Sequence, residues 1–331
     1  MNGNQMNILV AGAGGFIGGH LVSRLISEGH QVRAVDKKAL GDWYQIHPKA
    51  ENLVLDLSLK AEAYKSTENV EWVFNLAADM GGMGFIEANK ALCMLSSLIN
   101  THLLMGSVEN KVKRYFFSSS ACVYASWHQQ TSVDIALKED DAYPAEPEDG
   151  YGWEKLFGER MCRHFSEDFG LEVRIARYHN VYGPHGTYDG GREKAPAAAC
   201  RKVHELATGA ASKIQIWGDG NQVRSFTYIT DCIDGTLKLM NSEYSMPLNI
   251  GSAESITIQQ LYDIALKAAD VSQAEFEYDF TAPQGVRGRS SENTLCRETL
   301  GWAPSVAIDE GIRLTYAWIS QELNSRNNLK I

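Results

Sequence analysis

The sequence lacks the features of a disulfide-rich, metal-binding or membrane-spanning protein. Its 6 cysteines are widely scattered and form no Cys-x-x-Cys pair, so neither a disulfide framework nor a zinc site is indicated. No uninterrupted apolar run approaches the roughly 20 residues that cross a bilayer. Residues 1–5 lack the basic and apolar regions of a signal peptide. We therefore expect a cytoplasmic protein that binds no metal and no membrane.

The sequence also lacks an excess of positive charge. Its 31 lysines and arginines are outnumbered by 41 acidic residues, which gives a formal net charge of −10. This balance argues against general nucleic-acid binding, and an anionic substrate would have to be held by local arginines and lysines. The 331 residues, 44% of them hydrophobic, suffice for a large core and one or two domains.

The N-terminus has the pattern of a dinucleotide-binding turn. The apolar run Ile8–Ala11 predicts a strand, and Leu21, Leu25 and Ile26 recur at helical spacing. Between them, the glycines of Gly12–Gly18 permit a tight turn and let backbone amides approach a pyrophosphate at the positive end of a helix. We assign the cofactor contacts of this turn to Gly12, Gly15, Phe16, Ile17 and Gly18.

The second predicted strand, Gln31–Asp36, ends in an acidic residue. A carboxylate at this position binds the adenosine ribose diol and repels a 2′-phosphate, so Asp36 favours NAD over NADP. Arg33, Lys37 and Lys38 lie nearby in the sequence and could accommodate a phosphate, so NADP stays open.

Strand-like runs alternate with helical stretches along the first half of the chain, at residues 52–55, 72–77, 115–117 and 171–177. This alternation predicts an α/β fold of the Rossmann type, a doubly wound parallel sheet with a smaller C-terminal substrate-binding lobe. We place the NAD-binding domain at residues 1–177 and the mainly substrate-binding lobe at residues 178–331, with an approximate boundary across which the two could be interleaved. Further cofactor contacts are expected after the third and fourth strands, at Asp56, Leu57, Leu76, Ala77 and Ala78.

A tyrosine and a lysine stand four residues apart in the stretch Tyr151–Lys155. On a helix they would project from the same face, so the ammonium could lower the pKa of the phenol from about 10 towards neutrality and make it a usable base. A Tyr-x-x-x-Lys pattern by itself is more often an ordinary exposed helix face. Other motifs in the chain must therefore decide whether this pair is catalytic.

Five segments together carry a family resemblance, namely Gly12–Gly18, Asn75–Ala78, Ser118–Ser120, Tyr151–Lys155 and Arg177–Pro184. They resemble the extended short-chain dehydrogenases/reductases that act on nucleotide sugars, and the resemblance spans nearly the whole chain. It implies that Ser120, Tyr151 and Lys155 work with NAD to oxidise a sugar hydroxyl, which Ser120 orients and Tyr151 deprotonates. The family also implies a homodimer.

Longer motifs narrow the resemblance to the GDP-mannose 3,5-epimerases, through residues 78–84, 121–122, 190–196, 217–220 and 285–289. That subfamily implies transient oxidation of GDP-mannose at carbon 4, inversion at carbons 3 and 5, and re-reduction, towards GDP-L-galactose or GDP-L-gulose. The resemblance assigns the proton transfers on carbon to Cys122 and Lys194.

The chemistry gives the assignment of Cys122 and Lys194 a physical reason. A ketone at carbon 4 makes the protons on carbons 3 and 5 acidic, and inversion needs one group on each face of the sugar. The ordinary pKa values of a thiol and an amine, about 8.5 and 10.4, would need adjustment by burial or neighbouring charge. Without the family, Cys122 would be read as a small core residue and Lys194 as a solvated charge. Which of the two is the base stays open.

The resemblance also predicts the residues that bind the substrate. Arg224 and Arg289 suit a diphosphate because a guanidinium binds phosphate in a bidentate manner. The whole predicted set is Gly81, Ser120, Asn180, Glu193, Lys194, Ala195, Lys202, Gln222, Arg224 and Arg289. The neighbouring histidines His179 and His185 match no family position, and we expect them to be structural.

Three other functions compete with this interpretation. A nucleotide-sugar 4,6-dehydratase would carry an Asp-Glu pair where Ala121 and Cys122 stand. A 4-epimerase would need Ser120, Tyr151 and Lys155 but no flanking acid-base pair. A non-catalytic NAD or nucleotide-sugar sensor could use the same fold, because a fold alone never proves turnover. The intact Tyr151 and Lys155 argue against the sensor.

Overall fold

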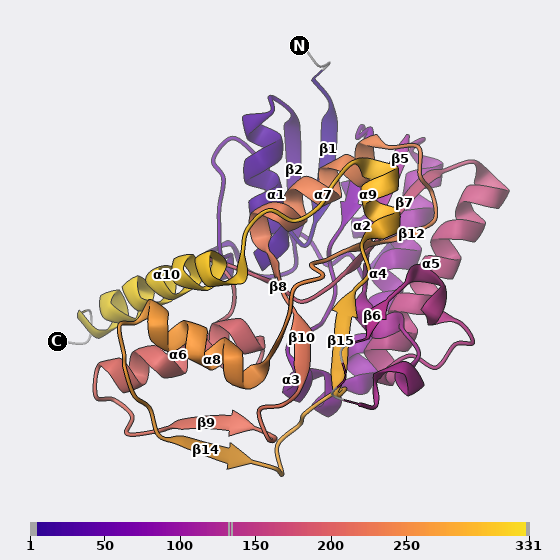
Figure 1. Ribbon diagram of the computed structural model, residues 1–331. Coiled ribbons are helices and arrows are strands. Elements are labelled where there is room, and N and C mark those ends of the chain that lie inside the picture. Colours follow the sequence, from indigo (N-terminus) through magenta and orange to yellow (C-terminus); the bar gives the residue numbers. More distant parts are fainter. Residues whose placement is uncertain (1–4, 132, 134, 329–331) are drawn as a thin grey trace.

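The computed structural model describes residues 5–131, 133 and 135–328 of the chain. Its main feature is a seven-stranded parallel sheet with the strand order β12-β7-β5-β4-β1-β2-β3 (Figure 1). In chain order these strands are β1 (Asn7–Ala11), β2 (Gln31–Asp36), β3 (Glu51–Val54), β4 (Trp72–Asn75), β5 (Arg114–Ser120), β7 (Glu172–Tyr178) and β12 (Pro247–Ile250). The predicted doubly wound α/β fold is confirmed.

Two strands differ in length from the sequence-based expectation. β4 ends at Asn75 rather than Ala77, because the Asn75 side-chain oxygen accepts a hydrogen bond of 3.2 Å from the Ala77 amide and turns the chain out of the sheet. β5 is longer than predicted and ends at Ser120, since its polar Ser118–Ser120 segment continues the parallel pairing with β7. Polar residues thus reach the carboxyl edge of the sheet within a regular strand.

The seventh strand, β12, lies in the C-terminal half of the sequence. It pairs in parallel with β7, with Pro247 opposite Ile175 and Ile250 opposite Tyr178. Helix α7 (Ile229–Asn241) also comes from this half and packs against α1 (Phe16–Ser27). Residues beyond 177 therefore supply both a strand and a covering helix to the sheet, and the proposed domain boundary stays a prediction.

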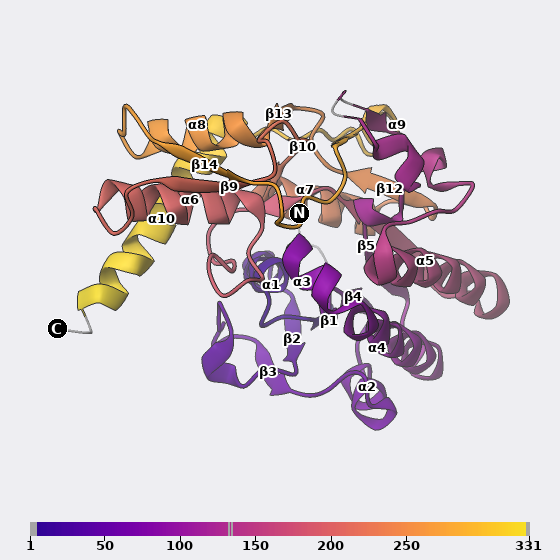
Figure 2. The same ribbon diagram turned by 90° about the horizontal axis from the view of Figure 1, so that it is seen from below.

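Helices cover both faces of the sheet in separate layers (Figure 2). One layer holds α2 (Lys60–Ser66), α4 (Lys90–Glu109) and α5 (Asp149–Phe169), and the other holds α1 and α7. Each strand packs against both helix layers, because successive side chains along a strand point to opposite faces of the sheet. In β1, Ile8 and Val10 belong to the cluster shared with α1 and α7, whereas Leu9 and Ala11 belong to the cluster beneath α4.

The α4 helix has one property that the sequence analysis did not predict. By length and composition it could cross a membrane, since the helix has 20 residues and an 18-residue window within it has a mean hydropathy of 1.4. In this structure it instead lies between α2 and α5, and its buried residues Ile99, Leu103 and Leu104 join the cluster under that layer. The predicted cytoplasmic location stays a prediction.

A smaller lobe is built mostly from the C-terminal part of the chain and lies at the lower left in Figure 1. Helices α6 (Ala195–Ala207), α8 (Ile258–Ala268) and α10 (Ile308–Asn328) pack on one another. Beside them lies a four-stranded sheet, in the order β13 (Ser255–Thr257), β10 (Val223–Ser225), β15 (Gly288–Ser291) and β6 (Ala136–Leu137). The remaining described elements are the strand pairs β8 (Val181–Tyr182) with β11 (Thr227–Tyr228) and β9 (Ile214–Trp217) with β14 (Phe276–Asp279), helices α3 (Met83–Ala88) and α9 (Thr294–Leu300), and 3-10 turns at Leu40–Asp42, Ala121–Val123, Ser126–Gln129 and Glu139–Ala142.

Strand β13 leads directly into helix α8. Residues Ser255–Thr257 pair with β10 as strand β13, and the helix begins only at Ile258. Thr257 and Gln260 form a capping box, in which each side chain accepts a hydrogen bond from the other residue's amide. The cap therefore sets the boundary between strand and helix.

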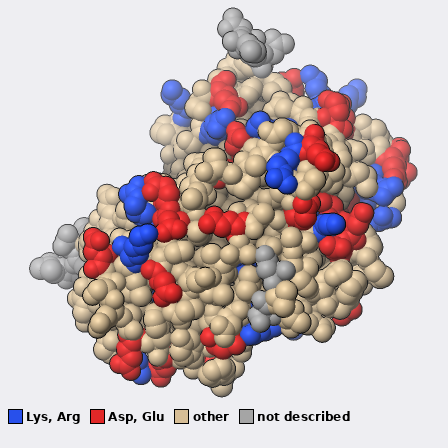
Figure 3. Space-filling model, in the orientation of Figure 1, with Lys and Arg blue, Asp and Glu red and all other residues tan. Residues whose placement is uncertain are grey.

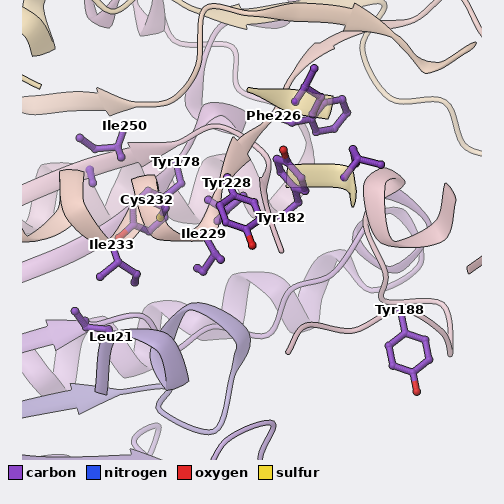
Figure 4. Packing of buried hydrophobic residues seen from close by; sticks show 14 of the residues in the cluster. Leu21, Tyr178, Tyr182, Tyr188, Phe226, Tyr228, Ile229, Cys232, Ile233 and Ile250 are labelled. Carbon is purple, nitrogen blue, oxygen red and sulfur yellow. The ribbon is translucent and has the colours of Figure 1, made fainter. Parts of the chain in front are cut away.

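The two parts of the molecule share one hydrophobic core. Figure 4 shows Leu21 of α1, Ile229 and Ile233 of α7, and a group of tyrosines around β8 and β11 within it. Tyr182 and Tyr228 pack edge to face with ring centroids 5.5 Å apart. This packing fixes the loops that follow β7 and β8 against the sheet.

Charged side chains of both signs are interspersed on the face shown in Figure 3. The acidic side chains on this face lie at several separate places rather than in one patch.

A buried ion pair ties α5 to the centre of the sheet. Arg177 of β7 donates from Nε and Nη2 to the two carboxylate oxygens of Glu159 at 2.9 and 2.7 Å, and from Nη1 to the Glu139 carbonyl at 2.6 Å. Ser119 of β5 donates to the same carboxylate at 2.5 Å. Arg177 and Glu159 are 2% and 3% exposed, so every polar atom of the pair depends on these partners.

We predict that Glu159→Ala lowers the free energy of unfolding by about 3–5 kcal/mol, because it leaves the buried Arg177 guanidinium without its counter-charge. Urea denaturation followed by circular dichroism measures this loss. Glu310→Ala is the matched control, since it breaks the solvent-exposed pair of Glu310 with Arg313 and should leave the unfolding midpoint near that of the wild type. Equal midpoints for the two variants would contradict the prediction.

Candidate active site

A cavity of about 540 Å³ lies at the carboxyl ends of the parallel strands. Ligands of open α/β sheets bind at this edge, where the strand order reverses. Its walls come from the ends of β1, β2, β4 and β5, from the start of α5, and from the loop that joins β8 to α6. All the residues predicted to contact the cofactor line this one cavity: Gly12, Gly15, Phe16, Ile17, Gly18, Asp36, Asp56, Leu57, Leu76, Ala77, Ala78, Tyr151 and Lys155.

The glycine turn is shaped so tightly that side chains are excluded from it. Gly12 has a φ of 84°, and a Cβ there would lie 2.9 Å from the Ala77 amide nitrogen. A Cβ on Gly18 would lie 2.1 Å from the Gly12 carbonyl oxygen. Helix α1 begins directly after this turn with no acidic residue in its first turn, so its N-terminal amides are electrostatically free for an anion. The turn therefore fits the pyrophosphate of a dinucleotide.

Asp36 lies at the end of β2 and lines the cavity, where an adenosine ribose would be expected. The basic residues that left NADP open are all engaged elsewhere. Arg33 binds Glu51 and two backbone carbonyls, Lys37 forms an ion pair of 2.7 Å with Asp79, and Lys38 donates to the Gly14 carbonyl. The groups around the ribose position thus favour a diol over a 2′-phosphate.

Ser120 ends β5 and begins the next turn of the chain. Its hydroxyl accepts a hydrogen bond of 3.2 Å from the Cys122 amide, so it caps the 3-10 turn Ala121–Val123. This cap fixes the position of the Cys122 backbone relative to β5, and with it the position of the thiol. Ser120 lines the cavity together with Tyr151 and Lys155, so the structure brings the three predicted oxidation residues together.

Tyr151 and Lys155 line the same cavity from one face of α5, as predicted, but the pKa of the phenol is raised rather than lowered towards neutrality. The Lys155 ammonium lies 5.6 Å from the centre of the Tyr151 ring and 3.5 Å from the carboxylate of Glu154. Burial raises the pKa of Tyr151, Cys122 and Glu154 raise it further, and its interaction with Ser120 lowers it. The lysine charge is taken up by the neighbouring carboxylate instead.

Cys122 and Lys194 belong to different elements but lie close enough to influence each other's pKa. Cys122 is half-buried in the turn after β5, and Lys194 is the residue that precedes α6. Burial raises the pKa of the Cys122 thiol, while the nearby charges of Arg289 and Lys194 lower it. Burial lowers the pKa of Lys194, and Cys122 raises it. Each residue thus acts on the pKa of the other, which places the predicted acid-base pair within electrostatic reach.

Two of the predicted substrate residues are arginines on neighbouring strands. Arg224 of β10 and Arg289 of β15 are partners in the parallel register of the small sheet. Burial lowers the pKa of Arg224, and the neighbouring charge of Arg289 lowers it further. Such a pair of cations is stabilised by an anion placed between them.

The other predicted substrate residues are spread around this centre. Gly81, Ser120 and Lys194 line the cavity, and Ala195 opens α6 directly after Lys194. Three others have their side chains engaged within the protein: Asn180 donates to the Ser225 carbonyl, Gln222 to the Trp217 carbonyl, and Lys202 to the Gln215 carbonyl at 2.7 Å. Glu193 accepts from the Gly191 amide and pairs with Arg201. The roles of all these residues stay predictions.

Both neighbouring histidines are held by protein contacts. His179 lies 2.9 Å from the Asn249 side-chain oxygen, and burial lowers its pKa to about 3. His185 packs against the Trp318 ring with centroids 5.2 Å apart. These contacts agree with the structural roles expected of them.

Sequence reasoning did not single out two carboxylates of the site. Glu154 is 3% exposed and neighbours Lys155, and burial raises its pKa. Its position three residues after Tyr151 on a helix was a signal that could have found it. Glu148 lies 3.1 Å from Arg289, across 141 residues of sequence, and no local pattern could have found that contact.

Comparison with known proteins identifies the family. Residues 8–251 match the model of the NAD dependent epimerase/dehydratase family. Over 96% of this chain, the sequence is 44% identical to GDP-mannose 3,5-epimerase 1 of Oryza sativa subsp. indica and 43% identical to GDP-mannose 3,5-epimerase of Arabidopsis thaliana, and it covers 83% of each.

Solved structures agree on the fold. UDP-glucose 4-epimerase of Thermotoga maritima superposes with a TM-score of 0.84 at 26% identity, covering 96% of this chain and 100% of that one. UDP-glucose 4-epimerase of Thermus thermophilus, in complex with NAD, superposes with a TM-score of 0.81 at 23% identity over 95% of this chain and 99% of that one. The predicted cofactor, NAD, and the predicted enzymatic nature of the protein are confirmed, and the chain belongs to the NAD dependent epimerase/dehydratase family.

Proposed function

We propose that this enzyme epimerises GDP-mannose at carbons 3 and 5, towards GDP-L-galactose, with GDP-L-gulose as the product of inversion at carbon 5 alone. The observation that carries the proposal is the similarity to two plant GDP-mannose 3,5-epimerases along nearly the whole chain. The site supports it as well, because Lys194 lines the cavity with the residues suited to oxidise a hydroxyl, and Cys122 is hydrogen-bonded through its amide to one of them, Ser120.

The first chemical step is the oxidation of the hydroxyl at carbon 4. Ser120 orients this hydroxyl, and Tyr151 takes its proton, which requires the phenolate form of Tyr151. Lys155 favours that form when its ammonium turns from the carboxylate of Glu154, the preceding residue, towards the phenol. The glycine turn Gly12–Gly18 and Asp36 would hold NAD, which would supply the hydride acceptor and donor for carbon 4 when bound.

The second step inverts a carbon next to the new ketone. Removal of its proton leaves an enolate, and return of a proton to the opposite face inverts the centre. Cys122 and Lys194 come from separate elements, the turn after β5 and the residue before α6. Two groups held on separate elements can flank a sugar ring, as inversion requires. Their opposed pKa shifts, upward for the thiol and downward for the amine, bring an acid and a base closer to equal strength.

The two arginines provide the binding energy for the diphosphate. Arg289 is 5% exposed, and its Nε has no partner among the described residues. A buried guanidinium with a free donor binds an anion strongly, because both groups leave water and gain a charge-assisted hydrogen bond. The interaction holds the nucleotide end of the substrate while the hexose reacts next to Cys122.

We also propose that the enzyme is a homodimer joined through α4 and α5. These neighbouring helices lie together on one side of the sheet in Figure 2. They expose a group of large apolar side chains, Leu92, Met94, Leu95, Leu98, Trp153 and Phe157, of which Leu95 is 57% and Phe157 55% exposed. A continuous apolar face on two neighbouring helices can cover the same face of a second copy about a two-fold axis.

Reaction in heavy water tests the proposed function. We predict that GDP-mannose converted in deuterium oxide gains deuterium at carbons 3 and 5 and keeps its original hydrogen at carbon 4, as NMR of the products would show. A 4-epimerase would leave carbons 3 and 5 unlabelled. Deuterium at carbon 6 with loss of its hydroxyl would indicate a dehydratase, and either outcome would overturn the proposal.

Variants separate oxidation from inversion. Tyr151→Phe should stop all turnover, because the phenolic oxygen that takes the hydroxyl proton is gone. Cys122→Ala and Lys194→Ala should still reduce the bound NAD on mixing with GDP-mannose but lose about 10² to 10⁴ in epimerisation rate. Rapid-mixing absorbance and product NMR measure the two steps. Cys296→Ala, at a buried cysteine in α9, is the matched control and should retain the rate. Epimerisation by Cys122→Ala at the rate of the control would sink the assignment.

The dimer surface has a direct test. The double variant Leu95→Asp and Phe157→Asp should run as a monomer in size-exclusion chromatography with light scattering, because two carboxylates would be buried unpaired in each half of the interface. Phe280→Asp introduces the same change at a residue that is 67% exposed next to β14, in the smaller lobe, and should leave the dimer intact. A wild-type protein that is monomeric at micromolar concentration would refute the proposal.

A further inference from the structure

Arg289 has two edges with different surroundings. Its Nη1 donates to the Ala121 carbonyl at 3.1 Å, to the Gln129 side-chain oxygen at 3.3 Å and to the Glu148 carboxylate at 3.1 Å. The Cys122 sulfur lies 3.9 Å from Nη1 and 4.0 Å from Nη2, and Nε has no partner among the described residues. The protein therefore anchors one edge of the guanidinium at Nη1, the thiol lies near both terminal nitrogens, and Nε stays open to a ligand.

Glu148 is the only negatively charged group on the anchored edge within the described residues. It is the residue before α5, and its side chain is 13% exposed against 6% for Arg289. Its amide donates to the Cys122 carbonyl at 3.2 Å, so the backbone of Glu148 is tied to the same turn that carries the thiol. Its position is thus fixed relative to both Arg289 and Cys122.

We propose that Glu148 is a positioning residue for the epimerisation. Its carboxylate holds the Nη1 edge of the Arg289 guanidinium so that the group lies against the Cys122 thiol and leaves Nε open to the diphosphate, and its charge offsets that of Arg289 at the thiol. The inference rests on the proposed function, since it gives Glu148 a part in the proton transfer assigned to Cys122.

Four charged or polar groups around the Cys122 thiol show how the Glu148 charge offsets that of Arg289. The thiol interacts electrostatically with Arg289 of β15, with Glu148 just before α5 and with Lys194 just before α6. It also interacts with the phenol of Tyr151 in α5. Arg289 and Lys194 favour a thiolate, whereas burial and Glu148 favour the thiol. With Glu148 ionised, the Arg289 and Glu148 pair has no net charge, and a thiolate would lack a full counter-charge.

The two contributions of Glu148 can be separated by substitution. Glu148→Gln keeps an oxygen that accepts from Nη1 but removes the negative charge. Glu148→Ala removes both the anchor and the charge. Glu146→Gln removes one negative charge from the same loop, two residues away, where the Glu146 side chain is exposed and binds Ser126 rather than Arg289. It is therefore the matched control for the charge alone.

The first measurement is the rate at which iodoacetamide alkylates Cys122, read by mass spectrometry of its peptide. The remaining cysteines, at positions 93, 162, 200, 232 and 296, are buried, so Cys122 should react first. In Glu148→Gln the thiol pKa should fall, because a charge that raises it has been removed. At pH 7 the rate should therefore rise by roughly threefold or more, since the thiolate fraction below the pKa grows tenfold per unit. Glu146→Gln should alkylate at the wild-type rate.

The second measurement is the affinity for GDP by isothermal titration calorimetry. Glu148→Gln should bind GDP within about twofold of the wild type, because the amide still anchors Arg289. Glu148→Ala should bind GDP about tenfold more weakly, because the guanidinium loses a charge-assisted hydrogen bond that fixes its orientation. A thermal melt identifies any loss of affinity that comes from unfolding, and Glu148→Gln provides the test if the alanine variant does not fold.

Alkylation of Glu148→Gln at the wild-type rate would overturn the charge part of the proposal. GDP binding by a folded Glu148→Ala at the wild-type affinity would overturn the anchoring part. Neither measurement requires turnover, so both remain interpretable if the deuterium experiment overturns the proposed reaction.

Discussion

The ion pair between Arg177 and Glu159 fixes the geometry on which the rest of the site depends. Arg177 belongs to β7 and Glu159 to α5, and Ser119 of β5 donates to the same carboxylate. Tyr151 and Lys155 lie earlier on α5, while Ser120 follows Ser119 on β5. A buried pair of this kind tolerates little displacement, because every polar atom must keep its partner. The distance between the tyrosine and the serine is thus set by a contact made elsewhere on the same two elements.

The site is organised as a set of buried charges that are matched in pairs. Lys155 lies by Glu154 and Arg289 by Glu148, each with the two side chains nearly withdrawn from solvent. Each buried charge needs its partner, because an unpaired charge in such a site is strongly destabilising, and in a dry site the loss or gain of one proton changes the local energy strongly. A reaction that moves protons to and from a phenol, a thiol and an amine benefits from such surroundings. Burial is the main cause that raises the pKa of Tyr151 and of Cys122, and the carboxylates Glu154 and Glu148 add to it, whereas the local motif had suggested that Lys155 lowers the pKa of Tyr151.

Local patterns predicted those features that depend on neighbours in the chain. The turn Gly12–Gly18 and the acid at the end of β2 were found because strand, turn and helix follow one another directly. The end of β4 was misplaced by two residues because the Asn75 side chain takes part in the turn. Strand β12 was missed because Pro247–Ile250 is short and carries a polar Asn249, which is buried only because it bonds Tyr124 and two carbonyls from distant segments.

The sequence by itself determined the fold class, the cofactor turn and the identity of the groups that can carry protons. Periodicity and motif spacing are properties of neighbouring residues, and they survive without a three-dimensional context. Only the tertiary structure decided what surrounds those groups: that the Lys155 charge is met by Glu154, and that Glu148 and Arg289, 141 residues apart, meet beside Cys122. The pKa of a buried group depends on burial and on charges brought near by folding, so it cannot be obtained from the order of residues alone.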